Sequence, residues 1–180
     1  MFIWFAAGSV AIVWAVFQSP AIDYRMVMLG SVLGVVEVGF RIAPLHTLAA
    51  PTIVLIVVGV ATIGHRLVRR QLLGIPIGMF LHLVLDGAWT RTDVFWWPAA
   101  GWWLPRERSL VISRGIWSVL LELLGIGLAV WLFDRFGLED RDRRRRFLSS
   151  GQLDRRYLRD GDGPAAGGSI NAPPNSEADR

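Results

Sequence analysis

Four residues of this sequence have side chains that could together hold a metal ion: Glu37, His46, His82 and Asp86. His82 and Asp86 are four residues apart, a spacing that puts both side chains on one face of a helix. Two imidazoles and two carboxylates suit Zn, Mn or Fe better than Mg or Ca. The isolated pair also fits a plain structural role, in which a carboxylate orients a buried imidazole inside a helical bundle. The spacing alone leaves both interpretations open.

The composition excludes several other kinds of chemistry. The chain has no cysteine, which excludes a thiolate metal site, a disulfide framework and a cysteine nucleophile. Its 19 basic residues are all arginine, which excludes a Schiff-base lysine and the P-loop lysine. These arginines border apolar runs, where they more often set membrane orientation, so we do not expect nucleic-acid binding.

Apolar residues dominate the first three quarters of the chain and predict a membrane protein. The whole chain is 53% hydrophobic, yet residues 134–180 contain more charges than residues 1–133. A helix needs about 20 apolar residues to cross the hydrocarbon layer. The sequence predicts an all-α, polytopic helical bundle with five transmembrane helices, at about 1–17, 26–40, 47–64, 71–89 and 109–133. Gly74, Pro76 and Gly78 predict a kink near the start of the fourth.

The positions of the arginines predict how these helices are oriented. The densest clusters lie in residues 65–70 and 141–146, and such clusters mark cytoplasmic segments. With five spans, both arginine clusters fall on the cytoplasmic side of the membrane. The predicted protein is therefore a multi-pass protein of the inner (plasma) membrane, with its N-terminus outside and its C-terminus in the cytoplasm. Glu37, His46, His82 and Asp86 then come from three spans to a similar depth near the outer surface.

The positions of a tryptophan-rich segment, of two charged residues and of one further histidine predict their roles. Residues 94–105 contain four tryptophans, which predict an interfacial segment that is either a plain aromatic belt or a lid over a site. Arg114 and Glu122 are about two turns apart, and mutual neutralisation is the expected role. His65 lies in the basic cytoplasmic loop and is expected to be solvated.

Residues 134–180 are expected to form an Arg-rich cytoplasmic tail. A short helix over 141–160 would lie on the anionic inner leaflet. Its apolar contacts would be Phe147, Leu148, Leu153, Tyr157 and Leu158. The rest of the tail has little to bury and is expected to be disordered.

Three blocks of the chain resemble a bacterial family of inner-membrane-associated, metal-dependent hydrolases described as LexA-binding. Residues 30–37 resemble its block G-x-x-L-P-D-x-D, and residues 45–48 resemble its block H-R-G-x-T-H-S. The most specific match is His82-x-x-x-Asp86, followed by Thr90 and Trp97-Pro98. The resemblance covers about residues 26–105.

The chain departs from that family at positions that matter for a metal site. Val35 stands where the family has its first Asp, Gly34 replaces the Pro, and Phe40 stands at the first His, although Arg41 follows it. These departures predict a mononuclear site, or an inactive one, in place of a two-metal site.

The resemblance implies a hydrolase that acts on a lipid or lipid-linked substrate in the membrane. His46, His82 and Asp86 would be metal ligands, with Glu37 as the fourth ligand or as the general base. Arg41 and Arg91 would bind a substrate phosphate. The alternative is a non-catalytic membrane protein with a structural polar cluster, whose Arg-rich tail binds a partner or the membrane. A transporter is a third, weaker alternative.

Overall fold

The structure is a computed structural model that describes residues 1–37, 44–99, 101 and 115–153. Every regular element in these ranges is a helix, so the predicted all-helical fold is confirmed. The α-helices are α1 (Phe2–Phe17), α2 (Tyr24–Val36), α3 (Ala49–Ala61), α4 (Arg66–Leu72), α5 (Gly74–Asp86), α6 (Thr92–Phe95), α8 (Ile116–Arg135) and α9 (Arg141–Ser150). Two short 3-10 helices, η2 (Pro44–His46) and η3 (Ala88–Thr90), complete the described elements.

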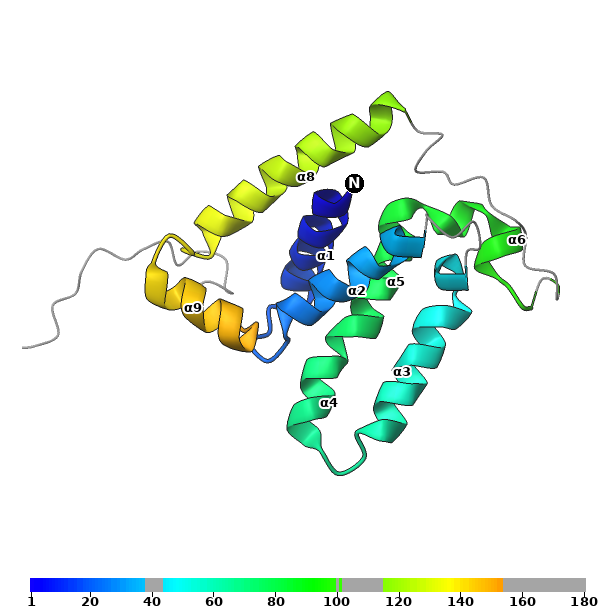
Figure 1. The fold of residues 1–180 in the computed structure, drawn as a ribbon, viewed down its shortest axis with the longest axis horizontal. Helices are drawn as coiled ribbons and strands as arrows, with labels where there is room; N and C mark the ends of the chain where they lie inside the picture. Colours follow the sequence, from blue (N-terminus) through cyan, green and yellow to red (C-terminus); the bar gives the residue numbers. More distant parts are fainter. Residues whose placement is uncertain (38–43, 100, 102–114, 154–180) are drawn as a thin grey trace, which may run out of the picture.

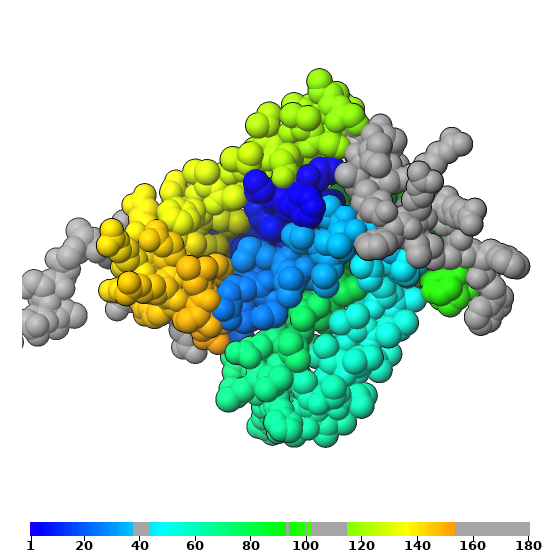
Figure 2. Space-filling model, in the orientation of Figure 1, coloured from blue at the N-terminus to red at the C-terminus, as the bar shows by residue number. Residues whose placement is uncertain are grey.

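Helix α1 lies at the centre of the arrangement, as Figure 1 shows. It packs against α8 on one side and against α2 and α5 on the other. Helices α3 and α4 form a hairpin on the side of α5 away from α8 (Figure 1). The space-filling view shows α9 against the start of α2, although the two are more than a hundred residues apart (Figure 2).

The most extensive contact joins α2 to α5, and glycines make it possible. A Cβ at Gly30 would overlap the Ile75 carbonyl, and a Cβ at Gly78 would overlap the Val27 carbonyl. The two backbones therefore approach more closely than any larger side chain allows. Such contacts between small residues are the usual way in which helices associate in apolar surroundings.

The helices begin and end at residues suited to those positions. The Asp23 carboxylate caps α2 by accepting hydrogen bonds from the N–H groups of Arg25 and Met26. Helix α5 ends at Gly87, which has the left-handed conformation with φ 69°. Leu73 is the single residue between α4 and α5. Pro76, in the first turn of α5, has no N–H to donate to the helical hydrogen bonds.

Five membrane-spanning helices are not all found at the expected length. Two described helices are long and apolar enough to cross a membrane, Arg66–Asp86, which joins α4 to α5, and Ile116–Arg135. Helices α1, α2 and α3 are apolar but have 16, 13 and 13 residues. At about 1.5 Å per residue, even the longest of them extends only about 24 Å. The expected segments 38–40 and 109–114 lie outside the described residues.

The hydrophobic core contains residues from both expected parts of the chain, the body at 1–133 and the tail from 134. Phe136 and Leu153 are buried with Trp14 and Tyr24 in one cluster, and Phe147 packs against it. Within the tail, the helix expected over 141–160 ends at Ser150, and the residues from 154 onward lie outside the described ranges. Phe147 and Leu153 therefore pack onto the body, whereas Leu148 is exposed.

A polar junction holds α9 to the turn between α1 and α2. The Tyr24 N–H donates to the Gly151 carbonyl at 2.9 Å, and Arg25 donates to the Leu148 carbonyl. Arg25 also forms an ion pair with buried Asp23 at 3.0 Å. The hydrogen bond to Asp23 raises the pKa of the Arg25 guanidinium.

Glu122 on α8 contacts the start of α1. Its carboxylate accepts from the N–H groups of Ile3 and Trp4 at 3.3 and 3.4 Å, and it lies 3.2 Å from the Met1 amino group. The carboxylate accepts hydrogen bonds from N–H groups in the first turn of α1, which have no partner within the helix. Its negative charge also interacts favourably with the helix dipole. Arg114, the expected partner, lies outside the described residues.

Because the α2–α5 contact leaves no room for a side chain at Gly78, we expect Gly78→Ala to lower the free energy of unfolding by about 1–3 kcal/mol. Thermal unfolding of the detergent-solubilised protein would measure this change. Gly59→Ala on α3 is the matched control, since a Cβ at Gly59 would meet nothing within 4 Å. Equal melting temperatures for both variants would contradict the close approach.

Candidate functional site

The structure brings Glu37, His46 and His82 into one chain of contacts at the end of α2. Glu37 follows the last residue of α2, His46 ends η2, and His82 lies in the second half of α5. The Nδ1 atom of His46 lies 3.1 Å from Oε2 of Glu37, and its Nε2 atom lies 3.4 Å from Nε2 of His82. All three side chains are buried, with exposed fractions of 6%, 7% and 1%.

The backbone around the two histidines determines which nitrogen of His82 carries its proton. Nδ1 of His82 lies 2.7 Å from the backbone carbonyl of Ser31, which can only accept a hydrogen bond. Nδ1 of His82 therefore carries the hydrogen, and in the neutral ring Nε2 presents a lone pair. The Ser31 hydroxyl lies 3.1 Å from that of Ser9, which extends this buried polar line to α1.

The same reasoning applies to His46. When Glu37 is ionised it can only accept, so Nδ1 of His46 donates to it and Nε2 again presents a lone pair. Two lone pairs 3.4 Å apart repel each other unless a proton or a cation lies between them. Two nitrogens bound to one tetrahedral Zn²⁺ at about 2.0–2.1 Å are separated by about 3.3–3.4 Å. The separation of the two Nε2 atoms thus matches that of two ligands on one ion.

Glu37 has a clear positioning role. Both of its carboxylate oxygens accept from the Leu45 N–H, at 3.0 and 2.9 Å, and Oε2 also contacts His46. Glu37 therefore holds the loop of η2 against the end of α2 and fixes the ring of His46. A carboxylate behind a metal-binding imidazole is a common arrangement, in which it sets the orientation and basicity of the ring.

Close packing fixes His82 from the other side. Its ring packs against that of Phe5 of α1 at a tilt of 41°, with centroids 4.2 Å apart, and a Cβ at Gly34 would overlap the His82 ring. The small residue at position 34, where the resembled family has proline, is therefore what lets the His82 ring lie against α2. Ser31 and Gly34 were not identified from the sequence, although the repeat of small residues at Gly30 and Gly34 is a known signal for close helix packing.

Asp86 and Arg91 lie on the chain after His82, on α5 and beyond it. Asp86 is buried at the end of α5, one turn after His82, with an exposed fraction of 3%. Within the described ranges, no group of three or more His, Asp or Glu side chains is placed to hold one metal ion. Arg91 is half-buried where η3 passes into α6, and Arg41 lies outside the described residues.

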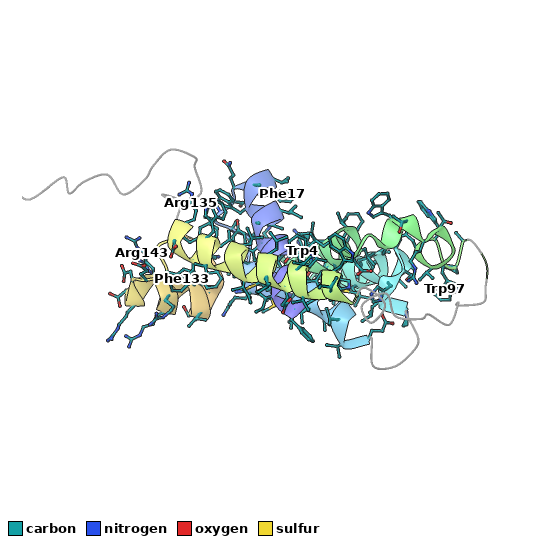
Figure 3. The ribbon with its side chains drawn as sticks, turned by 90° about the horizontal axis from the view of Figure 1, so that it is seen from above. Trp4, Phe17, Trp97, Phe133, Arg135 and Arg143 are labelled. Atoms are coloured by element: carbon teal, nitrogen blue, oxygen red, sulfur yellow. The ribbon has the colours of Figure 1, made fainter. Side chains whose placement is uncertain are left out.

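The tryptophan segment begins beside the loop that carries His46. The Leu48 N–H donates to the Phe95 carbonyl at 2.9 Å, which ties α6 to the start of α3. Trp96 and Trp97 follow at the far end of the molecule from α9 (Figure 3), and Trp102 and Trp103 lie outside the described residues. Both interpretations of the segment, an aromatic belt and a lid, remain predictions.

Comparison of the chain with models of known families, with curated proteins and with solved structures gave no significant match. The resemblance to the LexA-binding hydrolases therefore stays a prediction that depends on the three sequence blocks alone.

Because Glu37 satisfies both the Leu45 N–H and His46, we expect Glu37→Ala to lower the free energy of unfolding by about 1–3 kcal/mol. We expect Glu37→Gln to cost less, since its amide oxygen still accepts a hydrogen bond. Chemical unfolding in detergent would compare both with Glu139→Ala, whose side chain is exposed. A loss no larger than that of the control would contradict the positioning role.

Proposed function

We propose that this protein is an integral membrane protein that holds one divalent transition metal between His46 and His82 and hydrolyses a lipid or lipid-linked substrate. The observation that carries the proposal is the buried histidine pair, whose Nε2 atoms face each other at 3.4 Å while each Nδ1 has an acceptor. The alternative is the non-catalytic protein in which the same pair shares a proton and only holds η2 to α5.

Exposed apolar surface supports the membrane part of the proposal. A core helix of a soluble protein can be as apolar as α8, but such a helix is mostly buried. Only 11% of the apolar window in Ile116–Arg135 is buried. Water would have to cover a long apolar face, which soluble proteins rarely expose. Its exposed side chains include Ile116, Trp117, Val119, Leu120, Leu123, Leu124 and Val130.

The short helices are compatible with a site inside the outer part of the bilayer. Helices α2 and α3 have 13 residues each, so they extend about 20 Å where the hydrocarbon layer is about 30 Å thick. Irregular backbone at membrane depth is tolerated where protein buries it. Glu37 and His46 lie where α2 ends and just before α3 begins, and both are buried. We propose that the five segments enter the membrane with the N-terminus outside.

The donors fit Zn, Mn or Fe, because neutral imidazole nitrogens suit these ions. Such an ion supplies a water of lowered pKa and polarises an ester or phosphoryl oxygen. His46 and His82 would hold it, and Asp86, one turn from His82 on the same face of α5, is the third ligand that we propose. Glu37 and the Ser31 carbonyl would keep the two imidazoles oriented, and Arg91 remains a proposed phosphate contact.

The metal test uses the three histidines of the chain, of which His65 is exposed and caps α4. We expect the purified protein, equilibrated with Zn²⁺ and passed through a desalting column, to retain about one ion per chain by elemental analysis. His46→Ala and His82→Ala should lose it, and His65→Ala should keep it. Equal metal in all four proteins would leave the structural alternative.

Hydrolysis is measured separately on the same proteins. Release of fatty acid, headgroup or phosphate from labelled phospholipid vesicles should require the metal and should fall by at least about tenfold when a chelator removes it. Metal retention without any release would contradict the hydrolase while leaving the metal site in place.

The orientation predicts where fused reporters are active. Reporters placed after Arg70, after Pro105 and at the C-terminus should report inside, outside and inside, since the arginine clusters are expected to stay in the cytoplasm. An outside result after Arg70 would contradict the common depth of the four proposed site residues.

A further inference from the structure

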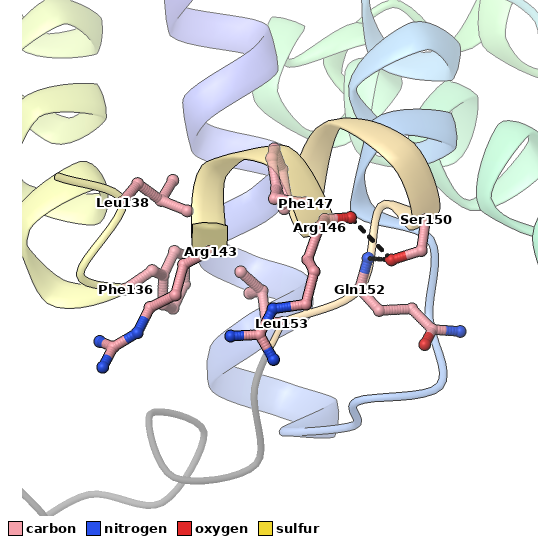
Figure 4. A pocket seen from close by; sticks show the side chains of 8 residues that line it. All are labelled: Phe136, Leu138, Arg143, Arg146, Phe147, Ser150, Gln152 and Leu153. Atoms are coloured by element: carbon pink, nitrogen blue, oxygen red, sulfur yellow. Dashed lines mark hydrogen bonds between the residues drawn. The ribbon is translucent and has the colours of Figure 1, made fainter. Parts of the chain in front are cut away.

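A cavity with polar and apolar lining lies between the end of α8 and α9, and it shares no lining residue with the histidine pair. It has a volume of about 290 Å³, and its polar lining comes from Arg143, Arg146, Ser150 and Gln152. Figure 4 shows both guanidinium groups extending on the same side of α9. The rim is held in place, because the Ser150 hydroxyl donates to the Arg146 carbonyl at 2.9 Å and accepts from the Gln152 N–H at 3.4 Å.

An apolar groove adjoins this cavity. Its volume is about 310 Å³, and all its lining residues are apolar, from α1, α2, α8, the segment that follows α8, and α9. Phe136, Leu138 and Phe147 line both cavities, so the arginines stand at one end of the groove. Figure 3 shows Phe133, which lines the groove, and Arg143, which lines the cavity, at the same end of the molecule.

We infer that the two cavities together bind one anionic phospholipid, with its phosphate on Arg143 and Arg146 and an acyl chain in the groove. Guanidinium groups three residues apart on a helix lie on one face and can donate several hydrogen bonds to one phosphate. Arg143 also contacts Asp140 through Nε at 3.4 Å. Its guanidinium group lies on the same side of α9 as that of Arg146 (Figure 4).

The order of polar and apolar surface favours a lipid over a free phosphate or a peptide. A free phosphate would use the arginines and leave the groove without a role. A lipid matches both parts, because the apolar groove runs along α8, whose apolar window is only 11% buried, and the arginines lie on α9, the next helix of the chain. This inference does not depend on the histidine pair, since the cavities share no residue with it.

Native mass spectrometry of the full chain in detergent tests the inference. We expect one phosphatidylglycerol per chain to bind at about tenfold lower concentration than phosphatidylcholine with the same acyl chains. Arg143→Gln with Arg146→Gln should remove this preference. Arg144→Gln with Arg145→Gln is the matched control, with the same loss of charge on the same helix but outside the cavity lining, and should keep it.

Two further measurements separate the lipid from other ligands. Ala129→Trp fills the groove from α8 without changing any charge, and should weaken binding of phosphatidylglycerol by at least about tenfold. Glycerol 3-phosphate should not compete at the concentrations at which the lipid binds.

The inference is overturned by any of three results. Equal losses in the two double-arginine variants would mean that general surface charge attracts the lipid. Undiminished binding to Ala129→Trp would remove the role of the groove. Competition by glycerol 3-phosphate would identify a phosphate site with no need for an acyl chain.

Discussion

The close approach of α2 and α5 is the contact on which the rest of the structure depends. Gly30 and Gly78 let the two backbones meet, and no side chain could be added at either position without moving a carbonyl of the other helix. The same contact brings His82 against Gly34 and within 2.7 Å of the Ser31 carbonyl. The histidine pair is therefore a consequence of helix packing as much as of the histidines themselves.

Buried polar groups are costly in such a fold, and the contacts around them explain why they persist. Ser9, Ser31, His82, His46 and Glu37 form one connected polar line through an apolar interior. An unsatisfied polar group would cost about 1–3 kcal/mol, and more in lipid, so each member stabilises the next. The two Nε2 atoms lie 3.4 Å apart within this line, and the proposed ion or shared proton would lie between them.

The two ends of the molecule have different chemistry. Imidazole and carboxylate groups are buried at the end where α2, η2 and α5 meet, and guanidinium groups line the cavity at the end where α8 meets α9. The Asp23–Arg25 pair and the Gly151 carbonyl attach α9 to the body, so its arginines have a fixed position beside the groove. The buried imidazoles at one end and the arginine-lined cavity at the other are both consistent with the proposed protein, which would act on a lipid at one end and bind an anionic lipid at the other.

The sequence by itself determined the class of fold and the residues that could do chemistry. Apolar runs bounded by Asp23, Pro44 and Gly87 predict helices. Capping residues and the spacing of apolar side chains are local signals, which extend over a few residues and can be seen in the sequence. It also singled out Glu37, His46 and His82.

Tertiary structure alone decided how they meet. Glu37 contacts the Leu45 N–H and His46, Glu122 contacts the start of α1, and Phe147 and Leu153 pack in or against the hydrophobic core. The physical reason is that hydrogen-bond partners in a bundle come from helices far apart in the chain, so that a carboxylate's role depends on which N–H groups packing brings to it.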